Sequence, residues 1–151
     1  MTAEVIPPAG RVLALDWGTT RIGLALSDAM QFVATPFAVL RRRTGKRFPL
    51  RAFLDVVERE QPVGLVVGLP LDDDGREGEH AIAARELGER CAERAGLPLA
   101  WIDESFSTAR SREMLIATGR APAAHRDRID ALAAADLLQH WLDARRAGAG
   151  A

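Results

Sequence analysis

Two short apolar runs near the start of the chain constrain the fold more than any other stretch. The first, 12–15, is short and apolar enough for a strand that is buried on both faces. The second spans 22–26, and the residues between the runs include Gly18 and two threonines, which are typical of a turn. The pair predicts an antiparallel hairpin within a sheet, with Asp16 at the exit of the first strand, where it is either a site residue or a turn cap.

The rest of the chain alternates strand and helix patterns. Continuous apolar runs predict further strands at 35–40, 63–69 and 97–102. Helical spacing predicts helices at about 49–60, 79–95 and 129–145, and one more that carries Met114. Residues 119–128 hold Gly, Pro, His125 and arginines without apolar periodicity, which predicts a loop. This order predicts an α/β fold: a five-stranded mixed sheet, with an antiparallel meander followed by parallel strands, and helices on both faces.

Length and composition indicate one ordinary globular domain over 1–151, with flexible tails at 1–9 and 147–151. The chain is 48% hydrophobic and 27% charged, and it has no stretch that resembles a membrane span or an export signal. The single Cys91 excludes an internal disulfide, so we expect a cytoplasmic protein. The net charge of −1 gives no overall signature of nucleic-acid binding, although basic side chains crowd residues 41–51.

Two further acids occupy positions that resemble that of Asp16. Glu104 follows the strand predicted at 97–102, and Asp130 begins the last predicted helix. If the first strand lies beside the fourth and the fifth beside the fourth, Asp16 and Glu104 meet at one edge of the sheet, where the last helix can add Asp130. Each acid alone is equally explained as a turn or helix-end residue.

Converging carboxylates repel one another unless a cation neutralises them. Ligand sets made only of oxygen atoms suit Mg²⁺ or Mn²⁺. Two such ions can activate a water molecule and stabilise the leaving oxygen of a phosphodiester. The three acids together therefore favour a metal site for phosphodiester hydrolysis.

Motifs along nearly the whole chain resemble those of the YqgF family, whose members are also called RuvX, pre-16S rRNA nucleases or Holliday junction resolvases. They are, in order, 15–28, 67–70, 74–75, 103–108, 128–134 and 138–143. The resemblance implies a ribonuclease H-like fold and a metal-dependent nuclease, with Asp16, Glu104 and Asp130 as catalytic, metal-binding residues. It further implies processing of the 5′ end of the 16S rRNA precursor, with ribosomal particles as possible partners, or else cleavage of four-way DNA.

The chain departs from the family pattern at two positions beside the expected phosphate site. Family members commonly carry Lys where this chain has Thr20, and Arg where it has Ser105. Both replacements remove positive charge, so other side chains would have to bind the substrate. The candidate substrate contacts are Gly18, Thr19, Thr20, Arg21, Ser107, Thr108, Arg126 and Arg128. In the wider ribonuclease H fold a loop histidine before the last acid can assist product or proton release, so the resemblance implies this role for His125, which is otherwise an exposed loop histidine.

Two other functions fit parts of the pattern. Residues 16–20 are also similar to the first phosphate loop of sugar kinases and actin-like ATPases, but those proteins enclose ATP between two domains. A non-catalytic RNA- or ribosome-binding factor would use arginines for phosphate contacts and would not need the three acids. The oligomeric state stays open, because a junction resolvase needs paired sites and an RNA-trimming enzyme does not.

Overall fold

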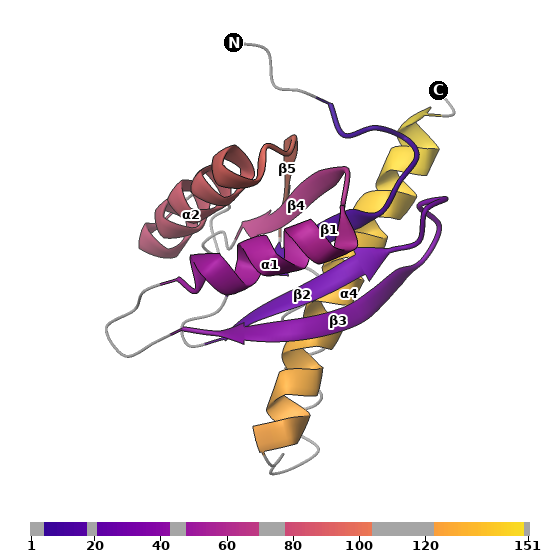
Figure 1. Ribbon diagram of the computed structural model, residues 1–151. Helices are drawn as coiled ribbons and strands as arrows, with labels where there is room; N and C mark the ends of the chain where they lie inside the picture. The colour runs from indigo at the N-terminus through magenta and orange to yellow at the C-terminus, as the bar shows by residue number, and fades with distance from the viewer. Residues whose placement is uncertain (1–4, 18–20, 43–47, 70–77, 104–122, 150–151) are drawn as a thin grey trace.

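The computed structural model describes residues 5–17, 21–42, 48–69, 78–103 and 123–149 (Figure 1). The strands are β1 (Val12–Asp16), β2 (Arg21–Ser27), β3 (Ala34–Arg41), β4 (Gly64–Leu69) and β5 (Leu99–Asp103). The helices in these ranges are α1 (Leu50–Glu60), α2 (Glu79–Ala95) and α4 (Ala123–Ala149). The helix predicted around Met114 lies outside the described residues.

The strands form one mixed sheet in the order β3-β2-β1-β4-β5. β1 runs antiparallel to β2 and parallel to β4, and β4 runs parallel to β5. This is the strand arrangement that the expected meeting of Asp16 and Glu104 requires. The carboxyl ends of β1, β4 and β5 therefore share one edge of the sheet. β2 begins and β3 ends at this same edge, because Arg21 pairs with Arg41. We call this edge, marked by Asp16, Arg21, Arg41, Leu69 and Asp103, the carboxyl edge.

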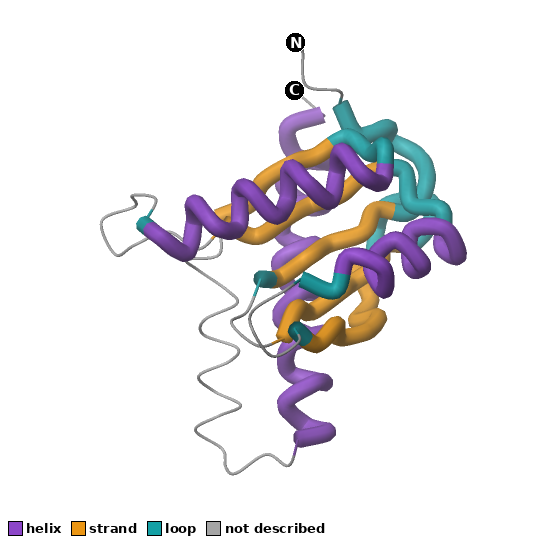
Figure 2. The backbone as a smooth tube through the Cα atoms, turned by 60° about the vertical axis from the view of Figure 1, so that its left-hand side comes forward, coloured by secondary structure: helices purple, strands orange, loops and turns teal. Residues whose placement is uncertain are grey.

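Helices cover both faces of the sheet, as predicted (Figure 2). Leu13 and Leu15 of β1 pack in a core cluster with residues of α1 and α2. Val12 and Ala14 point the other way and pack in a second cluster with α4. Since side chains alternate between faces along a strand, β1 is buried on both sides and presents each face to a different helical layer. Cys91 lies in the first cluster, and burial raises the pKa of its thiol to about 12.

The start of α4 corrects the second part of the loop that was predicted at 119–128, and residues 119–122 of that loop lie outside the described residues. The helix begins at Ala123, so the segment that carries His125 and leads to Asp130 is helical. In Figure 1 this end of α4 extends past the sheet. A helical turn that projects beyond the sheet has little core to face, so it needs no apolar stripe, and the absence of periodicity was misleading there.

Described residues near both ends of the chain pack against the rest of the fold, while residues 1–4 and 150–151 of the tails predicted as flexible lie outside the described residues. Ile6 is buried within the α4-side cluster, and α4 continues to Ala149. Gln31, which has a positive φ in the β2–β3 turn, donates from its side-chain amide to the carbonyls of Pro7 and Gly10. Arg145 of α4 donates to Gln31 Oε1 and to the carbonyl of Ile6. These contacts join both ends of the described chain at the edge opposite the carboxyl edge.

No helix in the described ranges has the length and apolar character to cross a lipid bilayer.

A side-chain hydrogen bond of Ser27 stabilises the β1–β2 hairpin. Its buried hydroxyl oxygen accepts a hydrogen bond from the Val12 amide at 2.8 Å and donates to the Asp28 carbonyl at 2.9 Å. Ser27→Ala leaves a buried amide without this acceptor, so we expect a loss of about 1–3 kcal/mol in the free energy of unfolding. Denaturant titration measures this change in the free energy of unfolding. Thr35→Ala, which removes an exposed hydroxyl in β3, is the control, and equal losses in both variants would contradict the assignment.

Candidate active site

Asp16 ends the central strand β1 and has no solvent-exposed surface. It lies on the α4 face of the sheet, because it is two residues from Ala14, which packs against α4. Its partner in the antiparallel pairing with β2 is Gly23, so these two positions share that face. A buried carboxylate at a strand end is held in one place, and burying it costs free energy unless positive charge or hydrogen bonds stabilise it.

Gly23 determines how closely α4 approaches this carboxylate. A Cβ built on Gly23 would lie 2.7 Å from the carbonyl carbon of Asp130 and would overlap its carbonyl oxygen. Because Gly23 has no side chain, the α4 backbone packs directly on β2 at the position that pairs with Asp16. The structure thus places Asp16 and Asp130 on the same face of the sheet at the carboxyl edge.

Asp130 forms an ion pair with Arg21. The Arg21 Nε atom lies 2.6 Å from Asp130 Oδ2, and the two side chains are 24% and 13% exposed. One helical turn earlier, Asp127 Oδ2 lies 2.5 Å from an Arg41 guanidinium nitrogen in a more exposed pair. The arginines are register partners on β2 and β3, so two ion pairs connect these strands to the start of α4.

The pairing of Arg21 with Asp130 was not predicted. Arg21 was expected only as a substrate contact. A signal was present in the sequence: an isolated glycine within a strand pattern marks a place where another backbone comes close. Gly23 is such a residue, and Arg21 shares its face two positions earlier. That reasoning would have placed Arg21 against whatever segment packs on Gly23.

Another arginine, Arg42, lies at the carboxyl edge on the opposite face of the sheet. The guanidinium carbon of Arg42 lies 4.2 Å from the ring centroid of Trp17, within the range of a cation–π contact. Trp17 packs against the core cluster of the α1 and α2 face. Arg42 therefore belongs to the other side of the sheet from Asp16 and Asp130.

Part of the predicted site lies outside the described residues. This part comprises Gly18, Thr19, Thr20, Glu104, Ser107 and Thr108, together with the side chains of His125 and Arg126. Arg128 is described and exposed on α4. Within the ranges that the structure describes, no group of three or more His, Cys, Asp or Glu side chains is arranged to hold a metal ion. Asp16 and Asp130, two acids that the structure describes on this face of the carboxyl edge, are carboxylates, the ligand type that Mg²⁺ and Mn²⁺ prefer.

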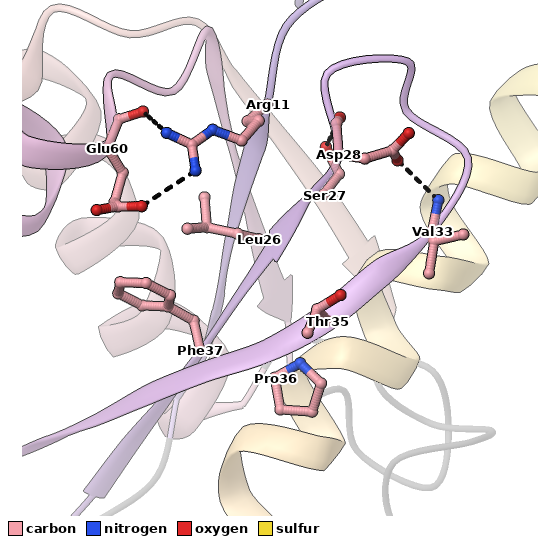
Figure 3. Close-up of a pocket in the computed structure, with 9 residues that line it drawn as sticks. All are labelled: Arg11, Leu26, Ser27, Asp28, Val33, Thr35, Pro36, Phe37 and Glu60. Carbon is pink, nitrogen blue, oxygen red and sulfur yellow. Dashed lines mark hydrogen bonds and ion pairs between the residues drawn. The ribbon is translucent and has the colours of Figure 1, made fainter.

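A cavity of about 290 Å³ lies at the other edge of the sheet (Figure 3). Its wall includes the ion pair between Arg11 and Glu60, at 3.0 Å, and the residues at the β2–β3 turn. Asp28 accepts hydrogen bonds from the Val33 and Phe32 amides, and the bond from Val33 contributes most to lowering its pKa. Because Arg11 precedes β1 and Asp16 ends it, this cavity is separate from the carboxylate pair.

Comparison with known proteins gives a consistent result. The family profile described as "RuvX: Holliday junction resolvase" matches residues 10–144. A protein of Anaeromyxobacter sp. (strain Fw109-5), named "Putative pre-16S rRNA nuclease", is 44% identical over 138 residues, which are 91% of this chain and 99% of that protein. A protein of Acidiphilium cryptum (strain JF-5) with the same name is 39% identical over 142 residues, covering 93% of this chain and 89% of the relative.

Among solved structures, the chain resembles RuvC of Thermus thermophilus in complex with a Holliday junction substrate. The TM-score is 0.54 at 19% sequence identity, with 91% of this chain and 96% of that chain covered. At this identity the likeness concerns the fold, and it confirms the predicted ribonuclease H-like α/β architecture.

Proposed function

The chain belongs to the RuvX family, and on that premise we propose that it is a divalent-metal-dependent nuclease that hydrolyses phosphodiester bonds in structured RNA. The proposed substrate is the 5′ end of the 16S rRNA precursor, processed in the cytoplasm during ribosome assembly. The observation that carries the proposal is the convergence of Asp16 and Asp130 on one face of the sheet at the carboxyl edge. The family match and the names of the relatives support the chemistry and the substrate class.

The described residues fit a hard divalent cation. Asp16 is a fully buried carboxylate. The backbone of Asp130 packs against Gly23, the residue that pairs with Asp16 in the sheet. We propose that these two residues and Glu104 hold Mg²⁺ or Mn²⁺. When bound, such ions lower the pKa of a coordinated water and stabilise the leaving oxygen. The protein contributes rigidity, because Asp16 lies in a central strand and the packing at Gly23 fixes Asp130.

A four-way DNA junction is the second candidate substrate, favoured by the description of the matching family. The two substrates make different demands on the protein. A junction has two-fold symmetry and requires two sites in one assembly, whereas trimming an RNA end requires one. Arg21 at the carboxyl edge serves either substrate, since phosphate contacts carry no sequence information.

The test compares both substrates under three metal conditions. Purified protein is incubated with a 16S precursor fragment or a four-way DNA, in Mg²⁺, in Mn²⁺ or in excess EDTA. We expect the RNA to be cleaved with either metal, EDTA to abolish cleavage, and the junction to stay intact. Paired symmetric nicks in the junction would instead establish the resolvase. RNA binding without cleavage under all conditions would identify a non-catalytic factor, and Mg·ATP binding by calorimetry would identify an ATP-binding module.

A further inference from the structure

The ion pair between Arg21 and Asp130 occupies one of the two carboxylate oxygens through which Asp130 would hold a metal ion. Arg21 Nε lies 2.6 Å from Asp130 Oδ2, so this oxygen accepts a short, charge-assisted hydrogen bond. Both side chains are largely shielded from solvent, at 24% and 13% exposure. A guanidinium at this distance blocks the approach of a divalent ion to the same oxygen.

Electrostatics explains why the Arg21 guanidinium lies beside Asp130. Asp16 is fully buried on the face that Asp130 adjoins, so two carboxylates would concentrate negative charge in a region with little water. Like charges in such a place raise the free energy of the fold unless a positive group compensates. Arg21 supplies this compensation from within the chain, two residues before Gly23 on the same face of β2.

We propose that Arg21 is an internal counter-cation for Asp130, and that a divalent metal ion displaces it from Asp130 Oδ2 on binding. This inference rests on the proposed function, because it requires a metal site that includes Asp130. Displacement frees the Arg21 guanidinium at the carboxyl edge, where it is available to a substrate phosphate. Arg21 is thus a positioning residue that competes with the metal and that adapts the site to its metal-free state.

A purely structural role for Arg21 predicts different behaviour. The neighbouring pair between Arg41 and Asp127 also connects a strand end to α4, but it lies further out, with side chains 60% and 33% exposed. If the Arg21 pair only held α4 in place, its loss would weaken the fold equally with and without metal. It would also loosen the site and lower metal affinity. If Arg21 competes with the metal ion for Asp130, loss of the pair should instead raise the affinity for the metal.

Isothermal titration with Mn²⁺ on the intact chain distinguishes these roles. The variants are Arg21→Gln, Arg21→Lys, Asp130→Asn and the matched control Arg41→Gln. We expect Arg21→Gln to bind Mn²⁺ more tightly than the unmodified protein by roughly two- to fivefold, the factor that a solvent-accessible ion pair contributes. Arg21→Lys, which keeps the charge but not the planar fork, should lie between them, and Arg41→Gln should match the unmodified protein. Thermal unfolding of Arg21→Gln should show a loss in EDTA that shrinks in saturating Mn²⁺.

The outcomes separate the two proposals. If the unmodified protein binds Mn²⁺, Asp130→Asn weakens this binding and both Arg21 variants bind with unchanged or lower affinity, the counter-cation role is wrong and the metal site stands. If the unmodified protein does not bind Mn²⁺, the proposed function fails, and this inference fails with it. If Arg21→Gln does not fold, the Arg21→Lys titration and its unfolding midpoints in EDTA and Mn²⁺ decide the question alone.

Discussion

Asp16→Asn is expected to reduce RNA cleavage by roughly 10³-fold or more, because a neutral amide does not replace a carboxylate ligand of a divalent ion. Binding of the RNA should survive, since Asp16 is fully buried and makes no surface for phosphate contacts. Single-turnover cleavage and a filter-binding assay on the same preparations measure the two quantities. The substitution preserves shape, so the packing of β1 against α4 stays intact.

The stability of the same variant provides an independent check. Asparagine has the shape of aspartate, so Asp16→Asn should still unfold in one cooperative transition in EDTA, which separates a loss of cleavage from a loss of folding. Asp55→Asn is the matched control, because Asp55 is 56% exposed on α1 and pairs with Arg51 away from the site. Asp55→Asn should cleave normally. Normal cleavage by Asp16→Asn, with contaminating nuclease excluded, would refute the active-site assignment.

Gly23→Ala is expected to lower both stability and cleavage. The new methyl group would overlap backbone atoms of Asp130, which cannot move aside as a flexible side chain does. Overpacking of this kind costs about 3 kcal/mol, and in a chain of this size the unfolding midpoint should fall by roughly 6–12 °C. Because α4 must shift away from β2, Asp130 also moves relative to Asp16, and a displacement of about 1 Å can reduce turnover by roughly 100-fold.

Gly148→Ala is the matched control for this effect. Gly148 lies near the end of the same helix, and a Cβ built there meets nothing within 4 Å. Alanine favours helix over glycine, so the control should be as stable as the unmodified protein or slightly more so. Equal destabilisation by both substitutions, or full cleavage by Gly23→Ala, would show that the close approach at Gly23 does not position Asp130.

The sheet could be predicted because its strands are continuous apolar runs. β1 and β4 have no polar side chain before their ends, so burial on both faces was evident. The neighbouring positions of β1, β4 and β5 entered the prediction only as a condition, and the structure meets that condition. The start of α4 could not be predicted in this way, since residues 123–128 carry no apolar stripe and this end of α4 extends past the sheet (Figure 1).

The candidate site was predicted in part. The sequence indicated that Asp16 and Asp130 meet, and the structure places both on one face at the carboxyl edge. It did not indicate that Arg21 pairs with Asp130, because a pairing between a strand start and a helix distant in sequence depends on tertiary packing. Glu104 lies outside the described residues, so its place in the metal site stays a prediction.

The contacts of Arg145 with Gln31 and Ile6 have a practical consequence for experiments. They fix the C-terminal end of α4 and the N-terminal segment together, at the side of the sheet away from Asp16. A biotin or fusion partner attached through either terminus should therefore leave the carboxyl edge pointing into solution. Immobilised protein on a biosensor chip is then suited to measuring RNA capture in a uniform orientation.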